Sequence, residues 1–291
     1  MAAPRPPLRA LLVDISGTLH IGYNPTIRAV EAFRQLQASG IPYRMCSNTS
    51  KESTRDVSTR LRELGFDVHD APASAEEGPR QVWTSVGAMR RIMDEIGVHR
   101  PYLLLSQSAR QELSTLSDSD SDSDSATTPF DGVVVGLCPA RLDYAHLNTA
   151  FRILACEHSA PSARAPILIA AHTARFLEAP TGGLALGPGP FVAALEHAAG
   201  VRAHVVGKPS RAFFEAVIAD ISVQEGGVVA IIGDDVEADL GGGARELGLW
   251  RVLVRTGKYR PGDETRTAVP PDEVVDSFAT FVESLLSDET H

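Results

Sequence analysis

Residues 9–18, RALLVDISGT, decide the fold class. The first half is a short apolar run, which predicts a strand buried on both faces. The run leads to Asp14, and Ser16 and Gly17 follow in a tight turn. A carboxylate at the carboxyl end of a buried parallel strand lies in the crevice where open α/β sheets bind ligands. An Asp at this position can also simply cap a turn, without binding a ligand. Whether Asp14 belongs to a ligand site therefore depends on the residues at the ends of the other strands.

Helix and strand patterns alternate after this stretch. Asn24 as a cap and Pro25 at the first helical position predict a helix that ends at Gly40. Residues Ile41–Cys46 predict the second strand, and Ser50 can cap the helix after it. This β-α-β-α order predicts a parallel sheet with helices on its faces.

The same alternation returns near the end of the chain. We expect helices at 190–199, 210–221, 235–247 and 276–286, and strands at 203–206, 228–232 and 250–254. These two flanking halves are expected to build one sheet, so the core domain comprises residues 1–77 and 186–291.

The middle of the chain, residues 78–185, alternates in the same way and is predicted to be an inserted α/β domain. Its expected helices are 80–96 and 143–155, and its expected strands are 102–105, 133–136 and 167–171. Within it, residues 117–125 read SDSDSDSDS, an acidic low-complexity tract that predicts a solvated loop.

Composition excludes several classes of protein. The 291 residues include 27 basic and 37 acidic side chains, a net charge of −10, without a dense Lys/Arg stripe, so nucleic acid is not expected as a partner. The apolar runs are far shorter than the roughly 18 residues of a membrane span, and Asp14 interrupts any apolar signal region. Three widely spaced cysteines, Cys46, Cys138 and Cys156, predict reduced thiols and a cytoplasmic protein.

A second group of carboxylates follows the strand predicted at 228–232. Asp234 ends that strand, and Asp239 lies five residues further on. Asp235 and Glu237, between them, are expected to face solvent at a helix N-terminus. Together with Asp14, Asp234 and Asp239 could form the all-oxygen cluster that Mg²⁺ prefers.

Polar side chains also follow two other predicted strands. Ser47 and Asn48 come after the second strand, and Lys208 follows the strand that ends at Val206. Lys208 could offset both the carboxylates and a phosphate. Each of these residues alone is more often an ordinary surface residue. Their conjunction, in the order Asp, Ser-Asn, Lys and Asp-x4-Asp, is what predicts a site.

This ordered set resembles the four motifs of the haloacid dehalogenase superfamily of phosphotransferases. The resemblance covers about residues 8–287 and implies a Rossmann-like parallel-sheet core with an inserted α/β cap of the second type. It is carried by seven stretches of sequence: DISGTLHI, SNTSKES, RLRELGFDV, GLALGPGPFVAALE, VVGKP, IIGDD and VRTGKYRPGDE.

The resemblance implies a role for each motif residue. Asp14 would be the nucleophile that forms an aspartyl-phosphate, and Lys208 would be catalytic beside it. Mg²⁺ would be held by Asp14, the Ser16 carbonyl and Asp234, with Asp239 in support. The substrate-binding residues would be Ser16, Ser47, Asn48 and Lys208. The implied reaction is a Mg²⁺-dependent phosphatase reaction on a small phosphorylated molecule, pyrophosphate or a P–N bond.

Ser16 departs from the wider superfamily, whose phosphatases usually carry a second Asp at this position as general acid. A serine hydroxyl cannot deliver a proton near neutral pH, and general acid catalysis is typically worth about 10²–10⁴-fold in rate. Substrates with good leaving groups need that acid least. The alternative is a catalytically weak protein that binds phosphorylated ligands on a hydrolase fold.

Specificity is expected to come from the inserted domain. His172 and Arg175, after the strand predicted at 167–171, are the candidates for facing a substrate, although both also suit rim or structural positions. The resemblance leaves a homodimer through the cap open. A response-regulator receiver does not fit, because its acidic pair lies on the first strand and its lysine on the last. A dinucleotide site does not fit either, because no G-x-G-x-x-G is present.

Overall fold

The computed structural model describes residues 5–69, 80–113, 130–157, 164–178, 183–221 and 226–288. They form two compact units, which are described separately. The first contains the described residues of 1–47, 57–83 and 208–291, and the second contains those of 48–56 and 84–207. None of the helices in these residues combines the length and the apolar character that a membrane span requires.

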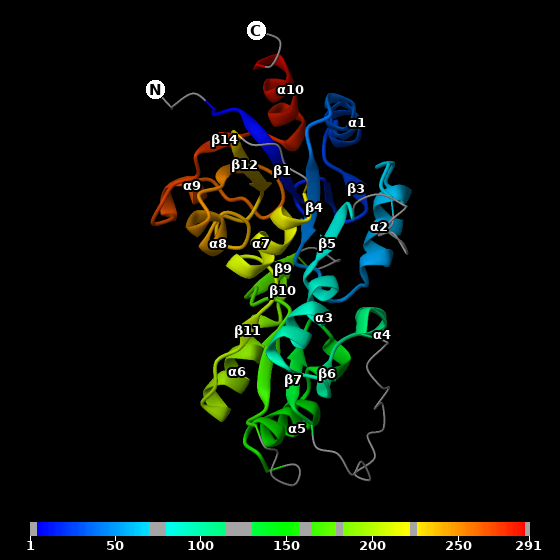
Figure 1. Ribbon diagram of the computed structural model, residues 1–291, viewed down its shortest axis with the longest axis vertical. Helices are drawn as coiled ribbons and strands as arrows, with labels where there is room; N and C mark the ends of the chain where they lie inside the picture. Colours follow the sequence, from blue (N-terminus) through cyan, green and yellow to red (C-terminus); the bar gives the residue numbers. More distant parts are fainter. Residues whose placement is uncertain are drawn as a thin grey trace. The chain divides into compact units, whose positions relative to one another are not determined.

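The first unit is built on a six-stranded sheet in the order β14-β13-β12-β1-β4-β5 (Figure 1). Every strand pair from β14 to β4 is parallel. The strands are β1 (Leu8–Asp14), β4 (Tyr43–Ser47), β5 (Val82–Thr84), β12 (Val228–Gly233), β13 (Trp250–Val254) and β14 (Glu273–Val275), with a small hairpin of β2 (His20–Ile21) and β3 (Asn24–Pro25). The helices are α1 (Ala29–Ser39), α2 (Thr54–Glu63), α7 (Arg211–Ala219), α8 (Gly242–Glu246), α9 (Asp263–Arg266) and α10 (Phe278–Asp288).

Both faces of this sheet are buried. Leu11 and Val13 of β1 share one apolar cluster with Phe33 of α1 and Phe281 of α10, and these two helices lie side by side in Figure 1. Leu12 points to the opposite face, because side chains alternate along a strand, and it is fully buried as well. The near-continuous apolar run of β1 is therefore that of a central strand covered on both sides.

The second unit has a parallel four-stranded sheet in the order β11-β8-β7-β6. Helices α5 and α6 pack against each other and share one apolar cluster with β7 and β8. The strands are β6 (Pro101–Leu104), β7 (Gly132–Val135), β8 (Ile167–Ala170) and β11 (His204–Val205), with a hairpin of β9 (Phe176–Glu178) and β10 (Leu184–Leu186). The helices are α3 (Ser85–Ile96), α4 (Gln107–Arg110), η1 (Gln111–Leu113), η2 (Pro139–Arg141), α5 (Tyr144–Leu154) and α6 (Gly189–Ala199).

The α/β class and the parallel sheets confirm the predicted fold. The boundary between the two domains, however, lies after residue 207 and not after residue 185 as expected. Strand β11 pairs with β8, and α6 packs against α5, so residues 186–207 belong to the second unit. The strand β5 lies inside the helix expected at 80–96, which begins only at Ser85, where Thr84 caps it. The Ser-Asp tract at 117–125 lies outside the described residues.

Three helix starts also differ from expectation. Asn24 and Pro25 form β3, because Thr26 bonds back to Thr18 and Leu19 and holds a hairpin, and α1 starts at Ala29. Ser53, and not Ser50, accepts from the N–H of Asp56 at the start of α2. The helix expected at 235–247 is shorter than predicted, because α8 covers only Gly242–Glu246.

Candidate active site

Asp14 is the last residue of β1 and lies opposite Cys46 of the neighbouring strand β4. The carboxyl group is buried, with 6% of the residue exposed. One oxygen, Oδ2, accepts a hydrogen bond of 3.0 Å from the Thr18 hydroxyl. The other, Oδ1, lies 2.6 Å from the ammonium of Lys208. Both oxygens of Asp14 are therefore held in one orientation.

Lys208 is a buried cation with three partners. Its Nζ lies 2.6 Å from Asp14 Oδ1, 2.7 Å from Asp239 Oδ1 and 2.9 Å from the carbonyl oxygen of Cys46. Burial alone would lower the pKa of Lys208, but Asp14 and Asp239 raise it above its usual value. The side chain thus stays charged, and each of its three protons has an acceptor.

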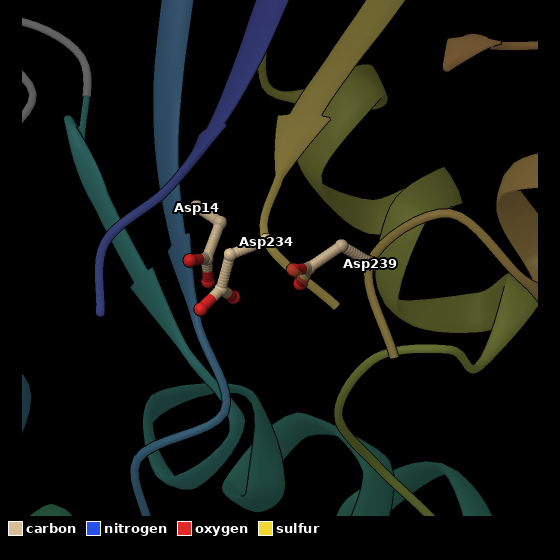
Figure 2. A group of neighbouring side chains, drawn as sticks. All are labelled: Asp14, Asp234 and Asp239. Atoms are coloured by element: carbon tan, nitrogen blue, oxygen red, sulfur yellow. The ribbon is translucent and has the colours of Figure 1, made fainter. Parts of the chain in front are cut away.

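Asp234 and Asp239 complete the cluster from the segment that follows β12. Figure 2 shows the side chains of Asp14 and Asp234 next to each other, with the carboxyl group of Asp239 turned toward them. The three groups are buried, and one oxygen of each lies within 4.8 Å of the others. Asp239 Oδ2 also accepts from the N–H of Asp235 at 3.1 Å. Both oxygens of Asp239 therefore already have partners within the protein.

The close carboxylates make this site electrostatically costly without a cation. Burial, together with Asp14 and Asp239, raises the pKa of Asp234 well above its usual range. Burial beside Asp14 also raises the pKa of Asp239 to about 6, although Lys208 opposes this. The metal-free cluster therefore retains protons at a pH where free aspartate is ionised.

A divalent cation fits the residues that are present. The local group contains four carboxylates and two ammonium groups, so two negative charges remain unbalanced. The carboxylates are those of Asp14, Asp234, Asp235 and Asp239, and the ammonium groups are those of Lys208 and Lys258. An all-oxygen donor set suits Mg²⁺ better than a transition metal. One such ion would neutralise the group and remove the reason for proton retention.

Lys258 belongs to this cluster as well, although no sequence motif indicated it. It follows β13, and its backbone N–H donates to Asp234 Oδ2 at 2.6 Å, while its Nζ lies 3.0 Å from Asp235 Oδ2. Burial alone would raise the pKa of Asp235, but Lys258 lowers it. The available signal was the position of Lys258 beyond a strand end, in the quoted stretch VRTGKYRPGDE.

The structure brings some of the predicted residues together and leaves others apart. Asp14, Lys208, Asp234 and Asp239 share one cluster, and Ser47 is buried at the end of β4, next to Cys46. Ser16 is exposed and pairs with His20 in an isolated β-bridge. Asn48 belongs to the second unit.

His172 and Arg175 also belong to the second unit and have different surroundings. His172 is buried, and its Nε2 lies 3.0 Å from the hydroxyl of Ser50. Because His172 Nδ1 accepts from the N–H of Ala174 at 3.3 Å, the ring proton lies on Nε2 and points to Ser50. Arg175 is exposed and lines a groove of about 560 Å³ with Phe176 and Leu186.

Comparisons with known proteins agree with the motif order. A sequence model described as haloacid dehalogenase-like hydrolase matches residues 11–117, and one described as HAD-hydrolase-like matches residues 205–281. Haloacid dehalogenase-like hydrolase domain-containing protein 2 of Homo sapiens is 39% identical over 286 residues, 98% of each chain. Phospholysine phosphohistidine inorganic pyrophosphate phosphatase of Homo sapiens is 34% identical over 283 residues, 96% of this chain and 94% of the other.

The solved structures support the same fold. The p-nitrophenyl phosphatase of Archaeoglobus fulgidus superposes with a TM-score of 0.76 at 25% identity, covering 97% of this chain and all of the other. The seven stretches quoted above resemble haloacid dehalogenase-like hydrolase domain-containing protein 2, and phospholysine phosphohistidine inorganic pyrophosphate phosphatase is also similar; the identities confirm both resemblances.

Proposed function

Because this chain belongs to the haloacid dehalogenase-like hydrolase family, we propose that it is a Mg²⁺-dependent phosphatase that works through a phosphoryl intermediate on Asp14. The observation that carries this proposal is the Lys208 ammonium, buried between Asp14 and Asp239. A protein that only binds a ligand has no need for a carboxylate fixed beside a buried cation. Turnover of p-nitrophenyl phosphate, with and without Mg²⁺, tests the proposal.

In the first step, an Asp14 oxygen attacks phosphorus, and the bond from phosphorus to the leaving group breaks. Thr18 and Lys208 hold the two oxygens of Asp14, so the nucleophile is oriented before substrate arrives. In the second step, water attacks phosphorus, the bond from phosphorus to the Asp14 oxygen breaks, and inorganic phosphate leaves with the protons of that water. Ser47, Asn48 and Lys208 are proposed to bind the phosphoryl oxygens.

The proposed metal ligands are Asp14, Asp234 and the backbone carbonyl of Ser16. Asp239 accepts from Lys208 and from the N–H of Asp235, and it is proposed to support Lys208 and not to bind the metal. When bound, Mg²⁺ would supply positive charge to the phosphoryl oxygens as the transition state forms.

The proposed substrates have good leaving groups, because Ser16 stands where an acid would protonate a poor one. Pyrophosphate, aryl phosphates and P–N bonds meet this requirement. The relative named phospholysine phosphohistidine inorganic pyrophosphate phosphatase supports this choice.

Ser16→Asp should narrow the gap between good and poor leaving groups. In the wild type, kcat/KM is expected to be roughly 10²-fold or more higher for an aryl phosphate than for an alkyl phosphate, because no acid protonates the alkoxide leaving group. The Ser16 side chain is exposed, so a carboxyl group can be accommodated and can deliver the missing proton. Equal rates for both esters in the wild type would show that another group supplies the proton.

Mg²⁺ should stabilise the protein more at pH 8 than at pH 5.5. The raised pKa values of Asp234 and Asp239 add stability below the usual aspartate range, and this stability is lost as pH rises, through about 6 in the case of Asp239. Mg²⁺ replaces the lost protons above that pH, and at 100 times its Kd it would add about 2.7 kcal/mol. Thermal unfolding with MgCl₂ or EDTA at the two pH values measures the difference. An equal shift in Tm at both would contradict the assignment.

Ser16 also motivates the alternative, a phospho-ligand-binding protein without turnover. Binding of a phosphorylated ligand with no release of phosphate from p-nitrophenyl phosphate at saturating Mg²⁺ would favour it. Turnover that EDTA abolishes would favour the phosphatase.

The proposed compartment is the cytoplasm. The three cysteines are free thiols, with Cys46 and Cys138 buried and Cys156 exposed. Burial raises the pKa of Cys46 to about 12, so this thiol is unreactive despite its place beside Lys208. Free thiols are typical of a reducing compartment.

A further inference from the structure

The segment Thr256–Lys258 contacts the candidate metal site from a strand that carries none of its carboxylates. It follows β13, which pairs in parallel with β12, so that Gly233 lies opposite Leu253. Asp234 and the segment 256–258 therefore leave the same edge of the sheet next to each other. The family motifs in the sequence gave this segment no role.

Gly257 and Gly17 enclose the carboxyl group of Asp234. A Cβ atom on Gly257 would lie 2.0 Å from Asp234 Oδ2 and 2.5 Å from the Cα of Gly17. A Cβ atom on Gly17 would lie 1.8 Å from the same oxygen. Both glycines have positive φ, 59° and 96°. The carboxyl group is thus packed between two backbone segments that leave no room for a side chain.

Hydrogen bonds fix this arrangement. The backbone N–H of Lys258 donates to Asp234 Oδ2 at 2.6 Å, and the hydroxyl of Thr256 donates to the Gly17 carbonyl at 2.5 Å. The second bond ties the segment to the turn after Asp14. Among the described residues, no donor bonds to Asp234 Oδ1, so this oxygen keeps all of its lone pairs for a ligand from outside the chain.

Lys258 adds a second attachment next to Asp234. Its ammonium pairs with Asp235 Oδ2 at 3.0 Å, and both side chains are partly buried. Asp235 Oδ1 in turn accepts from the N–H groups of Glu237 and Ala238. The segment is therefore anchored on both sides of Asp234.

We propose that Thr256–Lys258 is a carboxylate clamp that sets the orientation of Asp234 and presents its Oδ1 to Mg²⁺. Thr256, Gly257 and Lys258 are positioning residues that act through Asp234. This inference rests on the proposed function, because it assumes that Asp234 binds the metal.

Gly257→Ala tests the clamp, and Gly248→Ala is its matched control. Gly248 has a similar φ of 64°, but nothing lies within 4 Å of an added Cβ, so both variants carry the same backbone strain and only one meets Asp234. Isothermal titration of the full chain with MgCl₂, at pH 8 and without substrate, should show a Kd roughly 10- to 100-fold weaker for Gly257→Ala. Gly248→Ala should bind as the wild type does.

Thr256→Val is the second variant and decides the matter if Gly257→Ala does not fold. It removes the hydrogen bond to Gly17 without adding volume, and it should weaken Mg²⁺ binding roughly two- to tenfold. Thr256→Ser keeps the hydroxyl and should restore the affinity. In turnover assays the Mg²⁺ activation constant should rise, while kcat at saturating Mg²⁺ recovers.

The outcomes separate this inference from the proposed function. If the wild type binds Mg²⁺ and the Gly257→Ala and Thr256→Val variants bind it equally well, the clamp is refuted and the metal site stands. If the wild type does not bind Mg²⁺, the metal site itself is refuted, and the clamp with it. If Gly248→Ala lost as much Mg²⁺ affinity as Gly257→Ala, backbone strain alone would explain the loss in both variants. This result would overturn the clamp.

Discussion

Asp14→Asn should reduce turnover of p-nitrophenyl phosphate to background, a loss on the order of 10⁴-fold or more. The amide has nearly the same shape as the carboxyl group but is a poor nucleophile. The fold should persist, because Lys208 keeps Asp239 and the Cys46 carbonyl as partners. Steady-state kinetics together with circular dichroism measure both effects.

The control for this variant is Asp67→Asn, which makes the same chemical change at an exposed aspartate of the same unit. It should leave kcat unchanged. If Asp14→Asn kept more than about one part in 10³ of the wild-type turnover, the loss would be smaller than expected. Such a result would show that another group attacks phosphorus.

Lys208→Met should be both inactive and unstable. The substitution leaves Asp14 and Asp239 buried without their cation, and breaking a buried ion pair in this way typically costs about 3–5 kcal/mol. The cost should be larger at pH 8 than at pH 5.5. The pKa of Asp239 is already about 6 and rises further without Lys208, so a proton replaces the lost cation at the lower pH.

Urea unfolding at the two pH values measures this cost. Lys51→Met removes an exposed ammonium and should change the unfolding free energy by less than about 0.5 kcal/mol at either pH. A Lys208→Met variant as stable as Lys51→Met at pH 8 would contradict the account of the buried cluster.

The sequence predicted the strand ends well, because a parallel sheet places the carboxyl ends of its strands on one edge. Asp14 and Asp234 follow two neighbouring strands, β1 and β12, and apolar runs mark both strands clearly. Their meeting with Lys208 and Asp239 therefore followed from motif order and topology, without knowledge of any contact.

Contacts that depend on tertiary structure could not be predicted in the same way. Pro25 is typical of a helix start, yet it pairs with His20 in a hairpin that Thr26 holds. Ser50 is typical of a helix cap, yet it bonds to His172 and to the N–H of Leu137, both distant in sequence.

Lys258 shows the same limit within the site. Its backbone N–H makes the interaction with Asp234, and a backbone N–H does not depend on the residue type, so the sequence could indicate a role only by the position of Lys258 beyond a strand end. The two glycines around Asp234 were visible as residues, but their close approach depends on how two loops meet.

The central claim is that the phosphoryl group is transferred to the Asp14 carboxylate during turnover, and borohydride trapping tests it most directly. Borohydride reduces an acyl phosphate to an alcohol, so an aspartyl-phosphate caught during turnover of p-nitrophenyl phosphate becomes homoserine. Peptide mass spectrometry of the quenched protein should find homoserine at position 14 only in the sample that received substrate and Mg²⁺. Homoserine at any other aspartate, or an unmodified Asp14 in an active sample, would contradict the account.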